Sequence, residues 1–129
     1  WDDTMRRAEA YVRAGADMLF VEAVRTPEQV EALPGMFGVP LVYNYVETGK
    51  SPLLPVDELA RMGYKMVIYP ASALLTATKA VIDVVRVLRT DGGTEDLIED
   101  RMVSLIDCFE VAGLTDMLAT DARFASAET

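Results

Sequence analysis

The sequence has 129 residues, of which 51% are apolar, so it is long and apolar enough to build one modest domain with a core. Its formal net charge of −9 argues against a nucleic-acid partner, because a nucleic-acid surface needs a basic patch. The sequence contains no histidine and one cysteine, Cys108, so its chemistry must rely on carboxylates, Lys, Tyr, Arg or residues supplied from elsewhere. No apolar run is long enough to cross a bilayer, and we expect a cytoplasmic protein without a membrane partner.

Helices and short apolar strands alternate along the first part of the chain, with a period of about 25 residues. The first predicted helix covers residues 3–14 and ends at Gly15, which favours the left-handed conformation. The predicted strand at 18–21 is wholly apolar, as in a buried parallel strand. Thr26 then begins a short helix that ends by residues 34–35, with a capping box completed by the glutamine three residues later.

The same alternation continues from residue 40 to residue 89. A second strand is predicted at 40–43 and is followed by a polar loop at 44–55. A short helix at 57–62 leads to the third strand at 65–69, and a long helix covers 72–89. Each of the three strands is therefore followed by a helix, which indicates a parallel sheet built from βα units.

The last part of the chain is predicted to be helical. After a break at 91–93, Thr94 caps a further helix that ends at Gly113, with Cys108 on its apolar face as a core residue. A last short helix begins at Thr115, and the end of the chain at 124–129 is expected to be frayed. We therefore expect βα units in residues 1–93 and a helical extension in residues 94–129.

Three parallel strands are compatible with two architectures, a barrel and an open doubly wound sheet. No glycine-rich phosphate loop follows any of the three strands, which disfavours a nucleotide-binding open sheet. Closing a barrel takes about eight strands, and a free three-stranded sheet leaves two exposed edges. The pattern therefore indicates further strands beyond this sequence, and the first residue, Trp1 rather than Met, agrees with a processed chain or a fragment.

Polar residues follow the strands at the ends where βα enzymes bind their substrates. Glu22 ends the first strand, Asn44 ends the second with Glu47 three residues later, and Ser72 follows the third. Each residue also has an ordinary structural alternative. Glu22 can cap the next helix or pair with an arginine, Asn44 can serve as a turn residue, and Ser72 can cap the long helix. Lys50, a loop lysine that would usually be solvated, has flexible neighbours and can reach an anion.

Three segments resemble motifs of a known enzyme superfamily. Residues 14–23, AGADMLFVEA, are similar to the AGADMLF-x-EA segment of 2-methylisocitrate lyases and their relatives. Residues 40–52 follow the pattern P-hydrophobic-x-x-N-x-x-E-x-G-x-x-P of those enzymes, and residues 69–73, YPASA, resemble their YP-x-SA. On these segments, which lie in the same order and spacing as in the relatives, residues 5–93 resemble the isocitrate lyase and phosphoenolpyruvate mutase superfamily.

The resemblance implies a fold and an activity. The expected fold is α/β, the C-terminal portion of a (β/α)8 TIM barrel with about three βα units, followed by helices that the family exchanges between the subunits of a homo-oligomer. The expected enzyme is a Mg²⁺-dependent carbon–carbon lyase or decarboxylase that acts on a small anionic 2-hydroxy or 2-oxo dicarboxylate through a pyruvate enolate. A C–P bond phosphonomutase or hydrolase of the same superfamily, or a non-catalytic half-barrel assembly module, remains an alternative.

The resemblance also implies roles for particular residues. Glu22 would be catalytic, and the expected substrate-binding residues are Asn44, Tyr45, Val46, Pro70 and Ser72. The Mg²⁺ ligands of the family are expected on N-terminal strands outside this sequence, so we expect no metal site in the chain and no turnover by the chain alone. Leu75 stands where 2-methylisocitrate lyases carry a substrate-binding arginine, which favours a substrate smaller than a tricarboxylate.

Overall fold

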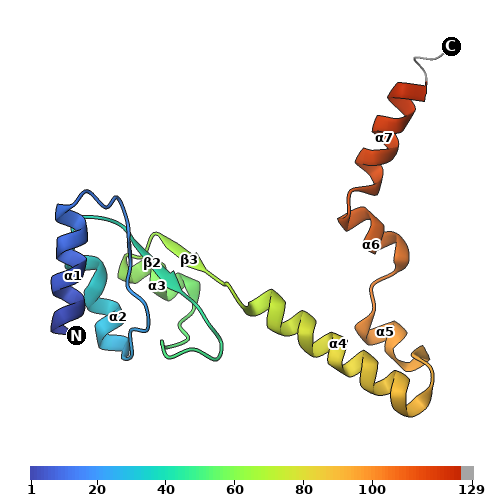
Figure 1. Cartoon of the computed structure of the whole chain (residues 1–129), viewed down its shortest axis with the longest axis horizontal. Coiled ribbons are helices and arrows are strands. Elements are labelled where there is room, and N and C mark those ends of the chain that lie inside the picture. The colour runs from blue at the N-terminus through green and yellow to red at the C-terminus, as the bar shows by residue number, and fades with distance from the viewer. Residues whose placement is uncertain (126–129) are drawn as a thin grey trace. The chain divides into compact units, whose positions relative to one another are not determined.

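The structure, a computed structural model, describes residues 1–125 and divides the chain into two compact units (Figure 1). The first unit comprises residues 1–78 and the second begins at Lys79. None of the helices in the described residues combines the length and apolarity needed to span a membrane. The predicted boundary between βα units and helical extension, at residue 93, stays a prediction.

The first unit contains a parallel three-stranded sheet, as the βα pattern predicted. Its strands are β1 (Leu19–Phe20), β2 (Leu41–Asn44) and β3 (Met66–Ile68), in the order β1-β2-β3. Leu19 pairs with Leu41, and Val42 pairs with Met66. Because both pairings are parallel, the carboxyl ends of the three strands lie at the same edge of the sheet. Each strand lies within one residue of its predicted span or inside it.

Helices of the first unit begin and end where local signals in the sequence place them. They are α1 (Asp2–Arg13), α2 (Pro27–Ala32), the 3-10 turn η1 (Leu33–Gly35) and α3 (Val56–Met62). Gly15 has a φ of +99°, a conformation that glycine adopts without steric cost. The backbone N–H of Gln29 donates to Thr26 Oγ1 at 3.3 Å, which confirms the predicted cap. In the predicted capping box the Gln29 side chain would accept from the N–H of Thr26. It instead accepts from the N–H of Arg25 at 3.2 Å.

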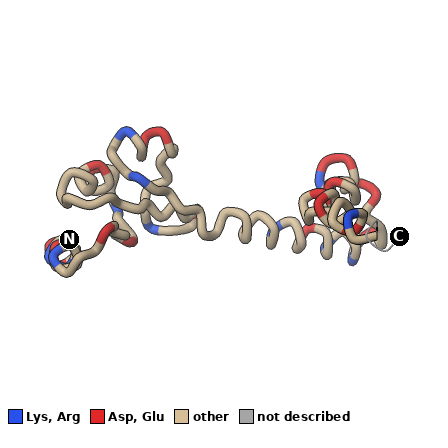
Figure 2. Tube along the Cα trace, turned by 90° about the horizontal axis from the view of Figure 1, so that it is seen from above, with Lys and Arg blue, Asp and Glu red and all other residues tan. Residues whose placement is uncertain are grey.

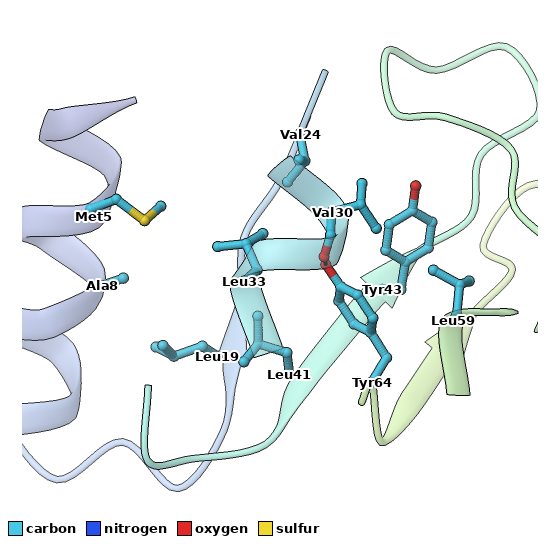
Figure 3. Close-up of a cluster of buried hydrophobic side chains, with 10 residues drawn as sticks. All are labelled: Met5, Ala8, Leu19, Val24, Val30, Leu33, Leu41, Tyr43, Leu59 and Tyr64. Atoms are coloured by element: carbon cyan, nitrogen blue, oxygen red, sulfur yellow. Dashed lines mark hydrogen bonds between the residues drawn. The ribbon is translucent and has the colours of Figure 1, made fainter. Parts of the chain in front are cut away.

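The core of the first unit lies between one face of the sheet and its helices (Figure 3). Alternate strand residues Leu19, Leu41 and Tyr43 are buried on this face, as expected from the two-residue period of a strand. They pack in a cluster with fully buried residues of the helical segments, namely Val30, Leu33 and Leu59.

The opposite face of the sheet is apolar and exposed within this chain. Phe20, Met66 and Ile68 keep 50%, 48% and 37% of their surface accessible. Apolar residues on both faces are typical of a parallel sheet that is covered on both sides. The exposed face is thus the one that would turn toward the interior of a barrel.

The second unit is built from helices alone within its described residues. The long helix α4 (Ser72–Asp91) leads into it, and the other elements are η2 (Glu95–Leu97), α5 (Ile98–Arg101), α6 (Leu105–Val111) and α7 (Leu114–Ala125). Leu97 is its one buried apolar residue among those described, whereas the large apolar residues of α4, α6 and α7 are exposed. Basic and acidic positions are interspersed along both units (Figure 2).

Three predictions for the second unit are wrong. Thr94, predicted as a helix cap, precedes η2 without a side-chain capping hydrogen bond. The helix predicted from Thr94 to Gly113 is interrupted, because Met102 is extended and Ser104 begins a new helix by accepting the N–H of Asp107 at 3.1 Å. Cys108, predicted as a core residue, is exposed. The frayed end predicted at 124–129 is helical up to residue 125, and residues 126–129 lie outside the described residues.

An acidic residue connects two helices of the second unit. Asp83 of α4 accepts from Lys79 and, at 3.1 Å, from Arg86 on the same helix, and it pairs with Arg101 of α5 at 3.5 Å. The hydrogen bond from Lys79, reinforced by the other two cations, holds the pKa of Asp83 below its usual range. The carboxylate is 14% exposed, so this ion-pair network is more enclosed than a typical surface pair.

Candidate functional site

The polar residues predicted at the strand ends converge at the carboxyl edge of the sheet. Asn44 is the last residue of β2, and Glu22 follows β1. Their side chains are 22 residues apart in sequence, and Asn44 Nδ2 donates a hydrogen bond to Glu22 Oε2 at 2.8 Å. Because both strands are parallel and in register, their ends reach the same edge and allow this contact.

The backbone after Glu22 has an unusual conformation that holds the carboxylate. Ala23 has a φ of +57°, which is uncommon for a residue other than glycine, and such conformations cluster at functional sites. In this conformation its backbone N–H donates to Glu22 Oε1 at 2.9 Å. Each Glu22 oxygen therefore has one donor, from Ala23 and from Asn44, rather than the helix cap or arginine partner that was the structural alternative.

The hydrogen bond to Glu22 also orients the amide of Asn44. A reversed amide would direct an oxygen at the carboxylate, so Nδ2 must be the atom that faces Glu22. Asn44 Oδ1 is then buried and has no hydrogen-bond partner within residues 1–125. Nδ2 carries a second hydrogen, and the amide thus keeps both donor and acceptor capacity. Asn44 lies within β2, so its alternative role as a turn residue does not apply.

A pocket of about 290 Å³ opens beside this pair. Its lining residues are Glu22, Ala23, Asn44, Val46, Gly49, Lys50 and Ser51. The sequence predicted three of these as site residues and considered Lys50, but it missed Ala23, Gly49 and Ser51. Gly49 closes a turn with its N–H on the carbonyl of Val46 at 2.9 Å, and a Cβ there would lie 3.1 Å from that oxygen. The sequence signal that could have identified Gly49 and Ser51 is that both are small residues on either side of Lys50.

The other predicted site residues lie near the same edge without lining this pocket. Ser72 Oγ donates to Glu47, and this bond lowers the pKa of the Glu47 carboxyl. The ring of Tyr45 packs against that of Tyr69 with centroids 4.9 Å apart. Pro70 connects β3 to α4. A substrate-binding role for Tyr45, Pro70 and Ser72 stays a prediction.

The described residues contain no cluster of metal ligands. Within residues 1–125, no three or more Asp, Glu, Cys or His side chains gather where they could hold a metal ion. Glu22 is a single carboxylate whose two oxygens already accept hydrogen bonds. These residues alone therefore do not fit a Mg²⁺ site, and the chemistry available to them is hydrogen bonding, charge stabilisation and proton transfer.

Comparison with known proteins identifies the family. The profile described as Phosphoenolpyruvate phosphomutase matches residues 1–89. A 2-methylisocitrate lyase of Halalkalibacterium halodurans is 34% identical over 94% of this chain and 40% of its own length. Oxaloacetate acetylhydrolase in complex with 3,3-difluorooxalacetate aligns with a TM-score of 0.85 at 32% identity, over 97% of this chain and 41% of its own. Phosphonopyruvate hydrolase in complex with oxalate and Mg²⁺ aligns with a TM-score of 0.74 at 31% identity, over 96% of this chain and 44% of the hydrolase chain.

The chain therefore belongs to the phosphoenolpyruvate mutase and isocitrate lyase superfamily. Its fold is the predicted one, the C-terminal portion of a (β/α)8 barrel with three βα units and following helices. The chain spans about two fifths of the length of the curated relatives that it matches. The exposed sheet face and the two uncovered strand edges agree with that partial span.

Proposed function

We propose that this chain supplies the substrate-binding part of the active site of a lyase that cleaves or decarboxylates a small 2-hydroxy or 2-oxo dicarboxylate. The observation that carries the proposal is the hydrogen-bonded pair of Glu22 and Asn44 at the carboxyl ends of adjacent parallel strands, beside a pocket that also contains Lys50. A carboxylate, an amide and an ammonium at one strand edge can hold an anionic substrate and move a proton.

The three polar groups have complementary tasks in this proposal. Lys50 provides a positive charge for a substrate carboxylate, and the second Nδ2 hydrogen of Asn44 donates to an oxygen of the substrate. Glu22 accepts the proton of a substrate hydroxyl, with its own orientation maintained by Ala23 and Asn44. Decarboxylation of a 2-oxo dicarboxylate leaves negative charge on a pyruvate-like enolate. Cleavage of a 2-hydroxy acid instead turns the deprotonated hydroxyl carbon into the carbonyl of a 2-oxo acid and leaves the electron pair of the broken bond on the enolate of the other carboxylate fragment, which then takes up a proton. Prearranged donors stabilise either enolate.

The side chain at residue 75 favours a small substrate. Leu75 is 42% exposed and offers no charge, so it cannot bind a third carboxylate as an arginine would. We also propose that the full-length protein is a cytoplasmic homo-oligomer that uses residues from 94 onward for subunit contact. Its Mg²⁺ would be held by residues outside this chain, and the chain by itself would not turn over substrate.

The test is to replace Glu22 by glutamine in the full-length protein and to measure the release of pyruvate or another 2-oxo acid from 2-hydroxy and 2-oxo dicarboxylates. Loss of a general base lowers kcat by roughly 10²- to 10⁴-fold. Glu31→Gln, which changes an exposed glutamate of α2, is the matched control and should keep the normal rate. Near-normal turnover by Glu22→Gln would show that Glu22 has only a structural role.

The second candidate is cleavage or rearrangement of a C–P bond. It is favoured by the profile match, whose description names a phosphomutase. Assays with phosphonopyruvate separate the two reactions: release of phosphate or formation of phosphoenolpyruvate, without cleavage of any dicarboxylate, would favour the second candidate. If neither class of substrate reacts, the non-catalytic assembly module becomes the better hypothesis.

A further inference from the structure

The pocket depends on a loop whose second half has few hydrogen bonds. Residues 45–55 connect β2 to α3, and four of the pocket residues, Val46, Gly49, Lys50 and Ser51, belong to this loop. We infer that Tyr43 is a positioning residue, which holds the loop in place through its hydroxyl group and so fixes the part of the pocket that Lys50 provides. The inference rests on the proposed function for its effect on substrate, but not for its effect on the loop.

Tyr43 reaches the loop from inside the core. Its side chain is 3% exposed, and its hydroxyl donates to the backbone carbonyl of Pro52 at 2.5 Å, nine residues later in the chain. Burial raises the pKa of the Tyr43 hydroxyl, so the group stays protonated and remains a donor at physiological pH. The donor is thus attached to β2, the strand that also carries Asn44.

The rest of the loop shows why this bond matters. The N–H of Tyr45 donates to the carbonyl of Ile68 at 2.9 Å, Glu47 accepts from Ser72, and Gly49 closes its own turn. Beyond that turn, the Tyr43 bond to Pro52 is the one hydrogen bond found for residues 50–54 within the described part of the chain. The first half of the loop is therefore held by several hydrogen bonds. The second half, which includes Lys50, is held by one hydrogen bond, at Pro52, and by packing of Leu54 against the core.

A second tyrosine keeps the Tyr43 ring in place. The rings of Tyr43 and Tyr64 meet edge to face with centroids 5.2 Å apart (Figure 3). The hydroxyl of Tyr64 donates to the carbonyl of Val30 at 3.0 Å. The usual helical donor to this carbonyl would be the N–H of residue 34, but Pro34 has none. The hydroxyl of Tyr64 thus binds the backbone of α2, whereas the hydroxyl of Tyr43 binds the backbone of the loop.

This division of roles provides a matched pair of variants. Tyr43→Phe and Tyr64→Phe each remove one buried hydroxyl from the same ring pair, and each leaves one backbone carbonyl without its donor. Only the first variant releases the loop. Both variants are compared in the full-length protein, with thermal unfolding measured to record any general loss of stability.

The first readout is opening of the loop, measured by tryptic cleavage after Lys50 under native conditions. We expect Tyr43→Phe to accelerate this cleavage roughly 3- to 10-fold, because one buried hydrogen bond is lost, and Tyr64→Phe to leave it within about 2-fold. The exchange rate of the Leu19 amide, which is buried in the core and donates to the carbonyl of Pro40, serves as the reference for general unfolding. Acceleration of cleavage no greater than that of Leu19 exchange, or equal in both variants, would refute the positioning role.

The second readout is the kinetics with the substrate found for the full-length protein. A loosened loop must be ordered when substrate binds, so Tyr43→Phe should raise KM several-fold with kcat changed less than about 2-fold, and Tyr64→Phe should leave both unchanged. Equal KM values in the two variants would also refute the role. If no dicarboxylate or phosphonate reacts, the proposed function fails, whereas the cleavage comparison still decides whether Tyr43 holds the loop.

Discussion

The two units of this chain use similar proportions of apolar residues in opposite ways. In the unit of residues 1–78, strands and helices bury one set of apolar side chains in a single cluster, in which Leu33, Leu41 and Leu59 are at most 1% exposed. In the unit that begins at Lys79, large apolar residues such as Leu105 and Val111 remain 70% and 92% exposed. An apolar helical pattern therefore does not ensure a buried face within one chain.

The candidate site lies in the unit that has the packed core. Glu22, Asn44 and Lys50 are all in the first unit, where a packed core beneath the sheet holds the strand ends in register. Isolated helices of the length of α6 and α7 gain little stability from propensity alone and depend on packing of their apolar faces. The first unit thus has the rigidity that a binding site needs.

The largest expected difference between the units concerns leucine truncation. Leu59→Ala, in the first unit, should lower the free energy of unfolding by about 2–5 kcal/mol, because it removes a fully buried side chain and leaves a cavity. Leu105→Ala, in the second, should change it by less than about 0.5 kcal/mol. Urea unfolding of the 129-residue chain measures both, because the proposed subunit contact of the full-length protein would cover α6. A loss of about 2 kcal/mol for Leu105→Ala in this chain would contradict the expected difference and reveal that another surface covers α6.

A smaller difference is expected between two threonines at helix starts. Thr26 accepts the N–H of Gln29, whereas Thr94 precedes η2 without a side-chain hydrogen bond. We expect Thr26→Ala to cost about 1 kcal/mol of stability and Thr94→Ala no more than a few tenths. Thermal unfolding of the two variants tests this, and equal losses would mean that the cap at Thr26 contributes nothing specific.

The smallest effect is expected from the ion pairs, and it depends on pH. The pKa of Asp83 is lowered in the folded protein, so its stabilising effect is complete above the ordinary value of 3.8 and is lost as the pH falls through the lowered pKa. The protection factors of the α5 amides, which are exchange rates corrected for the intrinsic pH dependence of exchange, should thus fall in acid, and Asp83→Asn should lower them already at pH 7. Asp3→Asn in α1 is the control, since Asp3 is 66% exposed and its pairs with arginine are screened by solvent. Similar effects of both variants in their own helices would contradict the enclosed network at Asp83.

Much of the first unit can be predicted from the sequence because its signals are local. Short, wholly apolar runs, glycines such as Gly15 that favour a left-handed φ, and the cap at Thr26 are local signals that place the elements and their boundaries. The candidate residues Glu22 and Asn44 could be named for the same reason, since parallel strands bring their carboxyl ends to one edge.

Other features were decided only by tertiary structure. The direct contact of Asn44 with Glu22, the left-handed Ala23 and the place of Lys50 in the pocket all depend on segments far apart in sequence or on a conformation that a residue type rarely adopts. In the second unit, periodicity predicted helices correctly, but it could not reveal the interruption at Met102 or the exposure of Cys108. The physical reason is that periodicity marks which side chains share a face, whereas burial depends on what packs against that face.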